Sequence, residues 1–158
     1  MSPANPDLKK RTRADYPFFL DYRTRWADND MYKHMNNAIY VFLFDSVLSA
    51  YLHDHCGLIA DSSPQHGMIV HSHTDYFAQI SFPAVADLGL RVNKIGRTSV
   101  THEIGLFERG FDDIRAVGEF VQVWVDRDTR RPAVGGINRM VRAGLDKIFM
   151  GSTTGSKL

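Results

Sequence analysis

The chain has 158 residues, of which 44% are hydrophobic and 23% charged, and its formal net charge is +1 at pH 7. These values predict one globular domain with a real core, and they give no electrostatic reason to expect binding to nucleic acid. The single cysteine, Cys56, excludes an internal disulfide and points to a reducing compartment such as the cytoplasm. The most apolar run, residues 38–52, carries Asp45 and is shorter than the roughly 20 residues that span a membrane, so no membrane span is expected.

The chain begins with a polar segment. Residues 1–15 contain no apolar stretch typical of a secretory signal, and we expect them to form a mobile N-terminal arm. Residues 16–25 are rich in aromatic side chains, which favour a first strand. The folded domain should therefore begin at about Tyr16, and we expect it to span residues 16–150.

A loop followed by a long helix comes next. Residues 26–35 follow no hydrophobic period and carry several acids and amides, which is typical of a loop. Asn36 or Asn37 is a good N-cap, because an amide oxygen can accept from the free N–H groups of the first helical turn. We expect the helix to run to Cys56, with Gly57 as the left-handed residue that ends it. Apolar residues cover most of its surface, so it should be surrounded by other elements.

Strands dominate the rest of the chain. Four segments are strand-like, and they span residues 66–77, 87–95, 98–108 and 115–126. The last has two apolar faces, so the helix should cover one of them and a partner subunit is a candidate cover for the other. Residues 137–149 are expected to form a short helix, and residues 151–158 a flexible tail. Together these elements predict an α+β fold in which an antiparallel β-sheet wraps around one long central helix.

Residues 23–40, R-T-R-W-A-D-N-D-M-Y-K-H-M-N-N-A-I-Y, carry the motif that points to a family. They resemble the signature of hotdog-fold acyl-CoA thioesterases of the 4-hydroxybenzoyl-CoA thioesterase type, which is roughly W/Y-x-D-x-D-x-x-G-H-V-N-N-x-x-Y. Residues 74–77 and 90–100 are similar to two later motifs of that family, and the resemblance covers about residues 18–130.

The resemblance implies a function and an assembly. The fold would be the hotdog fold, and the activity would be hydrolysis of an acyl-CoA to the free acid and CoA. No cofactor is implied, since coenzyme A is part of the substrate. The family makes homodimers by joining two sheets edge to edge, with the sites at the interface, and a tetramer stays open.

The resemblance also assigns catalytic roles. A carboxylate can attack a thioester or activate water, and the family's catalytic second aspartate falls on Asp30. The backbone amide that polarises the carbonyl falls on Asn37, at the positive end of the helix. His34 could orient the acid or hydrogen-bond within the loop, and Asp28 should stabilise the loop as an acceptor. Lys33 departs from the pattern, because the family usually has glycine there.

Four further residues are expected to contact the substrate. Arg97, Thr98 and Ser99 match the turn at which the family often meets CoA, and a cation beside hydroxyls suits a phosphate. For Arg97 an exposed hairpin turn is an equally good interpretation. Asn36, at the start of the helix, is the fourth candidate.

One of the strand-like segments carries residues that could form a metal site. His71, His73 and Asp75 alternate, so they would share one face of a strand and could ligate a metal. No fourth ligand is evident, and histidines beside a dimer seam explain the pattern as well. We therefore expect no metal.

The last three residues, Ser156, Lys157 and Leu158, match the peroxisomal address. In a eukaryote they predict binding to the peroxisomal import receptor and location in the peroxisome, whereas in a bacterium the match would be accidental and the protein cytoplasmic. Two alternative functions stay open. One is a hotdog hydratase or dehydratase acting on acyl-CoA, and the other is a non-catalytic acyl-CoA-binding protein.

Overall fold

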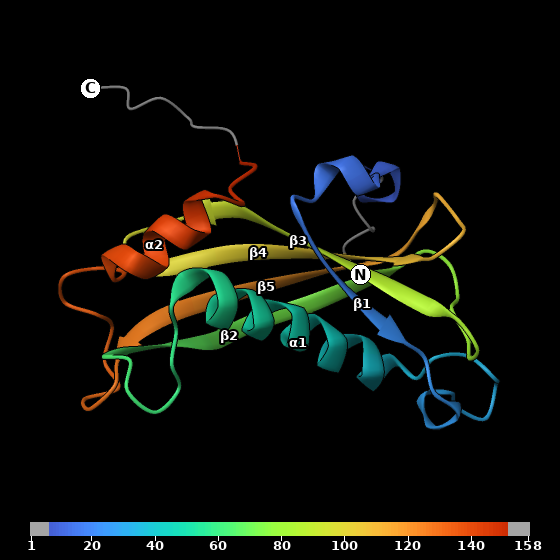
Figure 1. Cartoon of the computed structure of the whole chain (residues 1–158), viewed down its shortest axis with the longest axis horizontal. Coiled ribbons are helices and arrows are strands. Elements are labelled where there is room, and N and C mark those ends of the chain that lie inside the picture. The colour runs from blue at the N-terminus through green and yellow to red at the C-terminus, as the bar shows by residue number, and fades with distance from the viewer. Residues whose placement is uncertain (1–6, 152–158) are drawn as a thin grey trace.

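A computed structural model of the chain describes residues 7–151, so the targeting residues Ser156, Lys157 and Leu158 lie outside it and their role stays a prediction. Within the described residues, five strands form one antiparallel sheet in the order β1-β3-β4-β5-β2 (Figure 1). The strands are β1 (Phe18–Arg23), β2 (Gln65–Tyr76), β3 (Val85–Ile95), β4 (Ser99–Glu108) and β5 (Ile114–Asp126). The long helix α1 (Asn37–Cys56) packs on one face of this sheet, and the short helix α2 (Arg139–Asp146) packs against α1. The predicted α+β arrangement is confirmed.

Helix α1 begins and ends where its capping residues predict. The side-chain oxygen of Asn36 accepts from the backbone N–H of Ala38, and Gly57 ends the helix with φ 66°. The helix is buried along the side that faces the sheet, through Tyr40, Leu43, Phe44, Val47, Leu48, Tyr51, Leu52 and Cys56. The expectation that it is enclosed all round is only partly correct, because Phe42 is 70% exposed on the opposite side.

A glycine on β5 lets α1 approach the sheet closely. A Cβ atom at Gly118 would lie 2.4 Å from the ring of Phe44, which is much closer than two carbon atoms can pack. The same ring packs edge-to-face on Phe120, with 6.4 Å between the ring centroids. The separation of α1 from the sheet is therefore set by direct packing at Gly118.

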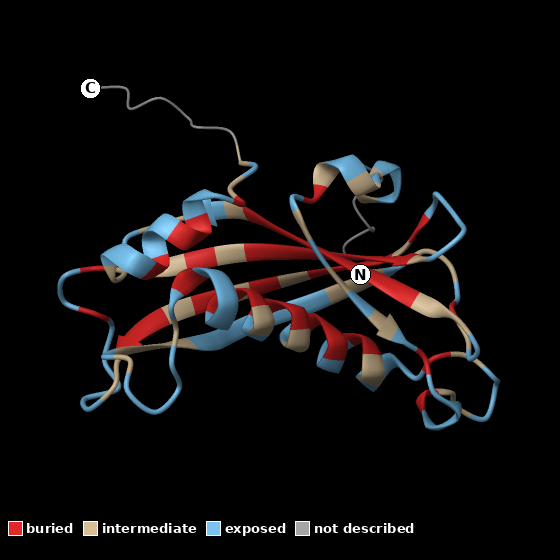
Figure 2. Cartoon of the chain, viewed as in Figure 1, coloured by how far each residue is buried: buried red, intermediate tan, exposed pale blue. Residues whose placement is uncertain are grey.

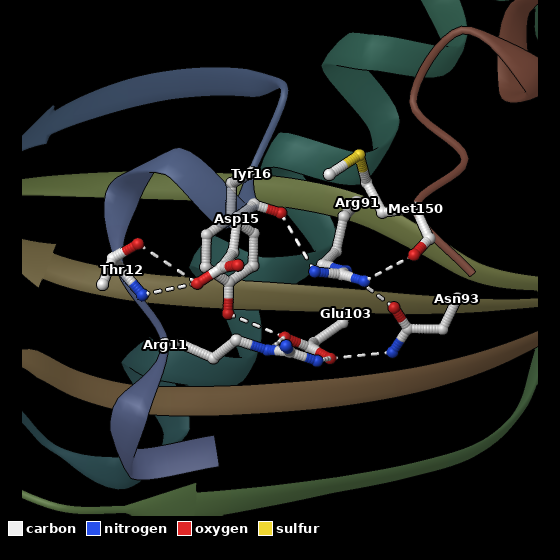
Figure 3. A network of polar contacts seen from close by, with 8 residues as sticks. All are labelled: Arg11, Thr12, Asp15, Tyr16, Arg91, Asn93, Glu103 and Met150. Carbon is white, nitrogen blue, oxygen red and sulfur yellow. Dashed lines mark hydrogen bonds and ion pairs between the residues drawn. The ribbon is translucent and has the colours of Figure 1, made fainter. Parts of the chain in front are cut away.

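Residues 7–15, the described part of the segment expected to be a mobile arm, pack against the sheet. These residues form two short 3-10 helices, η1 (Leu8–Lys10) and η2 (Arg13–Asp15), on the face of the sheet opposite α1 (Figure 1). The Arg11 guanidinium donates to both carboxylate oxygens of Glu103 at 2.8 and 3.0 Å, and Tyr16 and Asn93 donate to the same carboxylate (Figure 3). Glu103 is only 2% exposed, so it requires a partner charge, and the arm supplies it.

The N-terminal arm covers part of the second apolar face of β5, for which a partner subunit was the expected candidate cover. Val117 on that face lies in a small buried cluster with Tyr16, Phe107 and Ile114, and Leu8 of η1 packs against this cluster. A segment of the same chain thus covers part of the face for which a partner subunit was a candidate. No helix among residues 7–151 is long and apolar enough to cross a membrane.

Candidate active site

The loop between β1 and α1 is held by a buried carboxylate. Asp28, at the end of the 3-10 helix η3 (Trp26–Asp28), accepts from the backbone N–H of Arg25 at 2.7 Å and from the Tyr22 hydroxyl at 3.0 Å. Its backbone oxygen accepts from the N–H of Asn36 at 2.8 Å, which ties the two ends of the loop together. The prediction that Asp28 stabilises the loop is confirmed.

Asp30 has one oxygen that is held and one that is free. Its Oδ1 accepts from the backbone N–H of Tyr32 at 2.8 Å and of His34 at 3.4 Å. Its Oδ2 forms no hydrogen bond with any residue from 7 to 151. The carboxylate is therefore oriented by the turn and still has an oxygen available for a substrate or a water molecule.

Lys33 occupies a backbone conformation that favours glycine. Its φ is 64°, in the left-handed region that costs most residues roughly 1–2 kcal/mol. Its N–H donates to the backbone carbonyl of Asp30 at 3.0 Å, and its own carbonyl accepts from the Ser81 hydroxyl at 2.9 Å. The departure from the family glycine therefore leaves the turn intact, because these two hydrogen bonds hold the residue in place.

Asn37 brings a free backbone amide to the start of α1. Its N–H donates to no acceptor within the described chain, and the first turn of the helix contains no acidic residue to offset its positive end. Asn37 and Asp30 line the same hollow, of about 390 Å³. The other residues that line it are His34, Met35, Tyr40, Tyr76, Phe77, Ala78 and Gln79. The fold thus places around one hollow a residue with a free carboxylate oxygen, Asp30, and a residue with a free backbone amide, Asn37.

Two predicted site residues have other contacts than expected. His34 meets the Asp30 carboxylate through its backbone N–H, its imidazole forms no hydrogen bond with Asp30, and the residue lines the hollow. Asn36 uses its side-chain oxygen to cap α1 and lines neither this hollow nor the next one described. The prediction that Asn36 contacts the substrate therefore finds no support in this chain. The prediction that Asn36 caps the helix is confirmed.

A second hollow, of about 450 Å³, lies on another side of Asp30. It is lined by Trp26, Asn29, Asp30, Lys33 and Phe82. The rings of Trp26 and Phe82 stand edge to face, with 6.3 Å between their centroids. Phe82 carries no recognisable motif, and it reaches the site because its N–H donates to the Asn29 side chain at 3.1 Å. Asp30 therefore lies at the boundary of both hollows.

The predicted CoA-binding turn lies far from Asp30 in the same chain. The loop that carries Asp30 joins β1 beside the Val85 end of β3, whereas Arg97, Thr98 and Ser99 follow the Ile95 end. At a rise of about 3.3 Å per residue, the length of β3 separates them by about 30 Å. The Arg97 guanidinium donates to the Val134 carbonyl, which also ties this turn to a neighbouring loop. One chain alone does not bring these residues to the site.

The histidines of β2 do not assemble a metal site within the described part of the chain. The rings of His71 and His73 are 5.6 Å apart, and His73 Nε2 lies 4.0 Å from the Asp75 carboxylate. Among residues 7–151, no three His, Cys, Asp or Glu side chains are placed to hold a metal ion.

Comparisons with known proteins identify the family of this chain. The family model of the thioesterase-like superfamily matches residues 24–135. The structure is similar to that of the PA5185 protein of Pseudomonas aeruginosa, with 37% sequence identity, a TM-score of 0.84, and coverage of 89% of this chain and 98% of that one. A search of curated proteins finds no match.

Two more distant structures share the fold. The protein SAV2348 of Staphylococcus aureus, solved in complex with CoA, is 16% identical with a TM-score of 0.76, and the match covers 88% of this chain and 89% of that one. Slr0204 of Synechocystis, a 1,4-dihydroxy-2-naphthoyl-CoA thioesterase, is 12% identical with a TM-score of 0.73, and coverage is 82% and 95%. The chain therefore belongs to the thioesterase-like superfamily and is a hotdog-fold thioesterase.

Proposed function

We propose that this thioesterase hydrolyses acyl-CoA to the free acid and CoA, with Asp30 as its catalytic carboxylate. One observation carries the proposal: Asp30, which has a free carboxylate oxygen, and Asn37, which has a free backbone amide, line a single hollow at the positive end of α1. Two proteins of the same fold, one a naphthoyl-CoA thioesterase and one solved with CoA, support coenzyme A as the thiol.

The geometry supports two versions of the reaction. In one, Asp30 takes a proton from water, the resulting hydroxide attacks the thioester carbon, and the C–S bond breaks as the proton passes to the leaving thiolate. In the other, the carboxylate attacks the carbon itself, expels the thiolate and forms an anhydride that water then hydrolyses. In both, the carbonyl oxygen becomes negative, and the Asn37 N–H and the helix dipole stabilise that charge.

A panel of acyl-CoA thioesters tests the proposal. We expect the purified protein to release free CoA from at least one class of acyl group, measured by the appearance of the thiol. The same samples should be assayed for hydration of an enoyl-CoA, and their binding of CoA and acyl-CoA should be measured. Hydration without thiol release would favour the hydratase alternative, and tight binding without any turnover would favour the binding protein.

We further propose that two copies pair through β2. This strand is an edge of the sheet, and its residues 68–73 are exposed, as Figure 2 shows, with Val70 61% exposed. An exposed apolar edge is a template for another strand. If two β2 edges pair antiparallel about a twofold axis, the Gln65 end of one copy lies beside the Tyr76 end of the other. Because Ser99 lies on the Gln65 side of the sheet, the partner's Arg97–Ser99 turn would then approach the hollow of the first copy.

A charge on the edge tests this assembly. Val70→Lys is expected to convert a dimer to a monomer in sedimentation velocity, because a lysine at a paired edge opposes strand addition. Phe19→Lys places the same charge on β1, the other edge of the sheet, and should leave the sedimentation coefficient unchanged. A wild-type protein that sediments as a monomer at assay concentrations would contradict the proposal.

A further inference from the structure

The second hollow presents an exposed aromatic surface at the boundary of the active site. Trp26 is 82% exposed, although it stands on a short helix that the Asp28 carboxylate holds rigidly. Phe82 stands edge-to-face to it, so the two rings form adjoining apolar walls. Exposed aromatic side chains on a rigid support are typical of a binding surface. Burying them against a ligand is favourable, and little conformational entropy is lost because their support is already ordered.

Lys33 adds an unpaired cation to these walls. Its ammonium group forms no ion pair and no hydrogen bond with any residue of the described chain, even though Asp30 lies in the same turn. Its backbone is fixed on both sides by hydrogen bonds to Asp30 and Ser81. The hollow therefore combines apolar walls with a positive charge that has no internal partner, which suits a ligand with an apolar body and an anionic end.

Asp30 lies between the two hollows, so a thioester substrate would place its acyl group in one hollow and its pantetheine arm in the other. Asp30 lines both hollows, so the bond that is cleaved lies where they meet. The hollow beside Asn37 also contains Gln79 and His34 and reaches Tyr76 on the edge strand β2. The polar side chains that line this hollow suit the amides of the pantetheine arm. The acyl group would then occupy the other hollow, which is lined by aromatic rings.

We propose that the acyl group in the aromatic hollow carries a second carboxylate, so that the preferred substrates are CoA monothioesters of dicarboxylic acids. Its hydrocarbon part would lie against Trp26 and Phe82, and its distal carboxylate would pair with Lys33. This inference rests on the proposed function. A phosphate of CoA is a poorer candidate for Lys33, because the long pantetheine arm holds the phosphates far from the thioester.

A matched pair of substrates tests the inference. Adipoyl-CoA and hexanoyl-CoA have the same chain length and differ in a terminal carboxylate. We expect the wild type to have a kcat/KM for adipoyl-CoA about tenfold higher than for hexanoyl-CoA, and Lys33→Gln to remove this preference, because a charged hydrogen bond is lost. Glutamine keeps a side chain in the same left-handed backbone, so the comparison isolates the charge. Lys147→Gln, an exposed lysine at the end of α2, is the control and should keep the preference.

Four further outcomes decide between the alternatives. Lys33→Gly should also lose the preference while unfolding at a temperature no lower than the wild type, since glycine suits φ 64°. If Lys33→Gln instead weakens inhibition by free CoA and affects both substrates equally, the cation serves the CoA arm and the inference is overturned. Equal rates of the wild type on both substrates would also overturn it while leaving acyl-CoA hydrolysis established. Hydrolysis of no thioester at all would refute the proposed function as well.

Discussion

Asp30→Asn is expected to lower kcat/KM for the best acyl-CoA about a thousandfold, a loss typical of removing a general base. Asparagine keeps the oxygen that accepts from the Tyr32 and His34 amides, so the turn should survive. The amide can neither take a proton from water nor attack the thioester carbon, so the chemistry should fail. Steady-state release of CoA measures the effect, and an unchanged unfolding temperature would show that the loss is chemical.

A matched control and a labelling experiment sharpen this test. Asp21→Asn makes the same change at an exposed carboxylate on β1 and should keep full activity. Near wild-type kcat/KM in Asp30→Asn would remove this residue from the mechanism. Single turnover of the wild type in oxygen-18-labelled water then tests the nucleophilic role, because label in the Asp30 side chain requires water to attack the Asp30 carbonyl carbon of an anhydride intermediate.

Arg11→Ala is expected to destabilise the protein by about 3 kcal/mol at neutral pH, because it leaves the buried Glu103 carboxylate without its counter-charge. Burial alone would raise the pKa of Glu103, but the hydrogen bonds from Arg11, Asn93 and Tyr16 outweigh it and hold the pKa below its usual value. Urea unfolding would measure the loss. Lys10→Ala removes a cation of an exposed pair in the same segment and should change stability by less than about 1 kcal/mol.

The effect of Arg11→Ala should depend on pH with a definite sign. A carboxylate whose pKa is lower in the folded state adds stability above its unfolded pKa, and this stability is lost as the pH falls through the folded value. For Glu103 the ordinary value is 4.5, so the wild type should lose this contribution below that pH. In Arg11→Ala the ionised Glu103 carboxylate contributes less stability at neutral pH. The unfolding free energies of the wild type and the variant should therefore converge in acid. A difference that stays constant from neutral pH to acid would show that the guanidinium acts through packing alone.

The parts of the site that are close in sequence could be predicted from it. The resemblance to the family motif pointed to Asp30 and Asn37, which are close in sequence, and Asn36 was predicted as a cap because a capping residue acts within a single helical turn. The strands and the central helix followed from hydrophobic patterns. The turn around Lys33 was also local, although its left-handed backbone became clear only in the structure.

Contacts between distant parts of the chain could not be predicted. The ion pair of Arg11 and Glu103 joins residues 92 positions apart, and the polar composition of the arm suggested mobility. Phe82 reaches the second hollow through a single hydrogen bond to Asn29, which no local pattern encodes. The distance from Asp30 to the Arg97 turn depends on how the strands are ordered in the sheet, so a motif match at each end could not show that they lie apart.

The close contact between Phe44 and Gly118 has a consequence for how this site can vary. The Asn37 amide, which we propose polarises the carbonyl, is carried by a helix whose distance from the sheet is fixed deep in the core, well away from the loop. Side chains of the loop can therefore change without moving that amide, as Lys33 illustrates. If the proposed roles hold, substrate choice and carbonyl activation are separable in this fold, and substitutions in the loop should change acyl preference while the helix keeps its position.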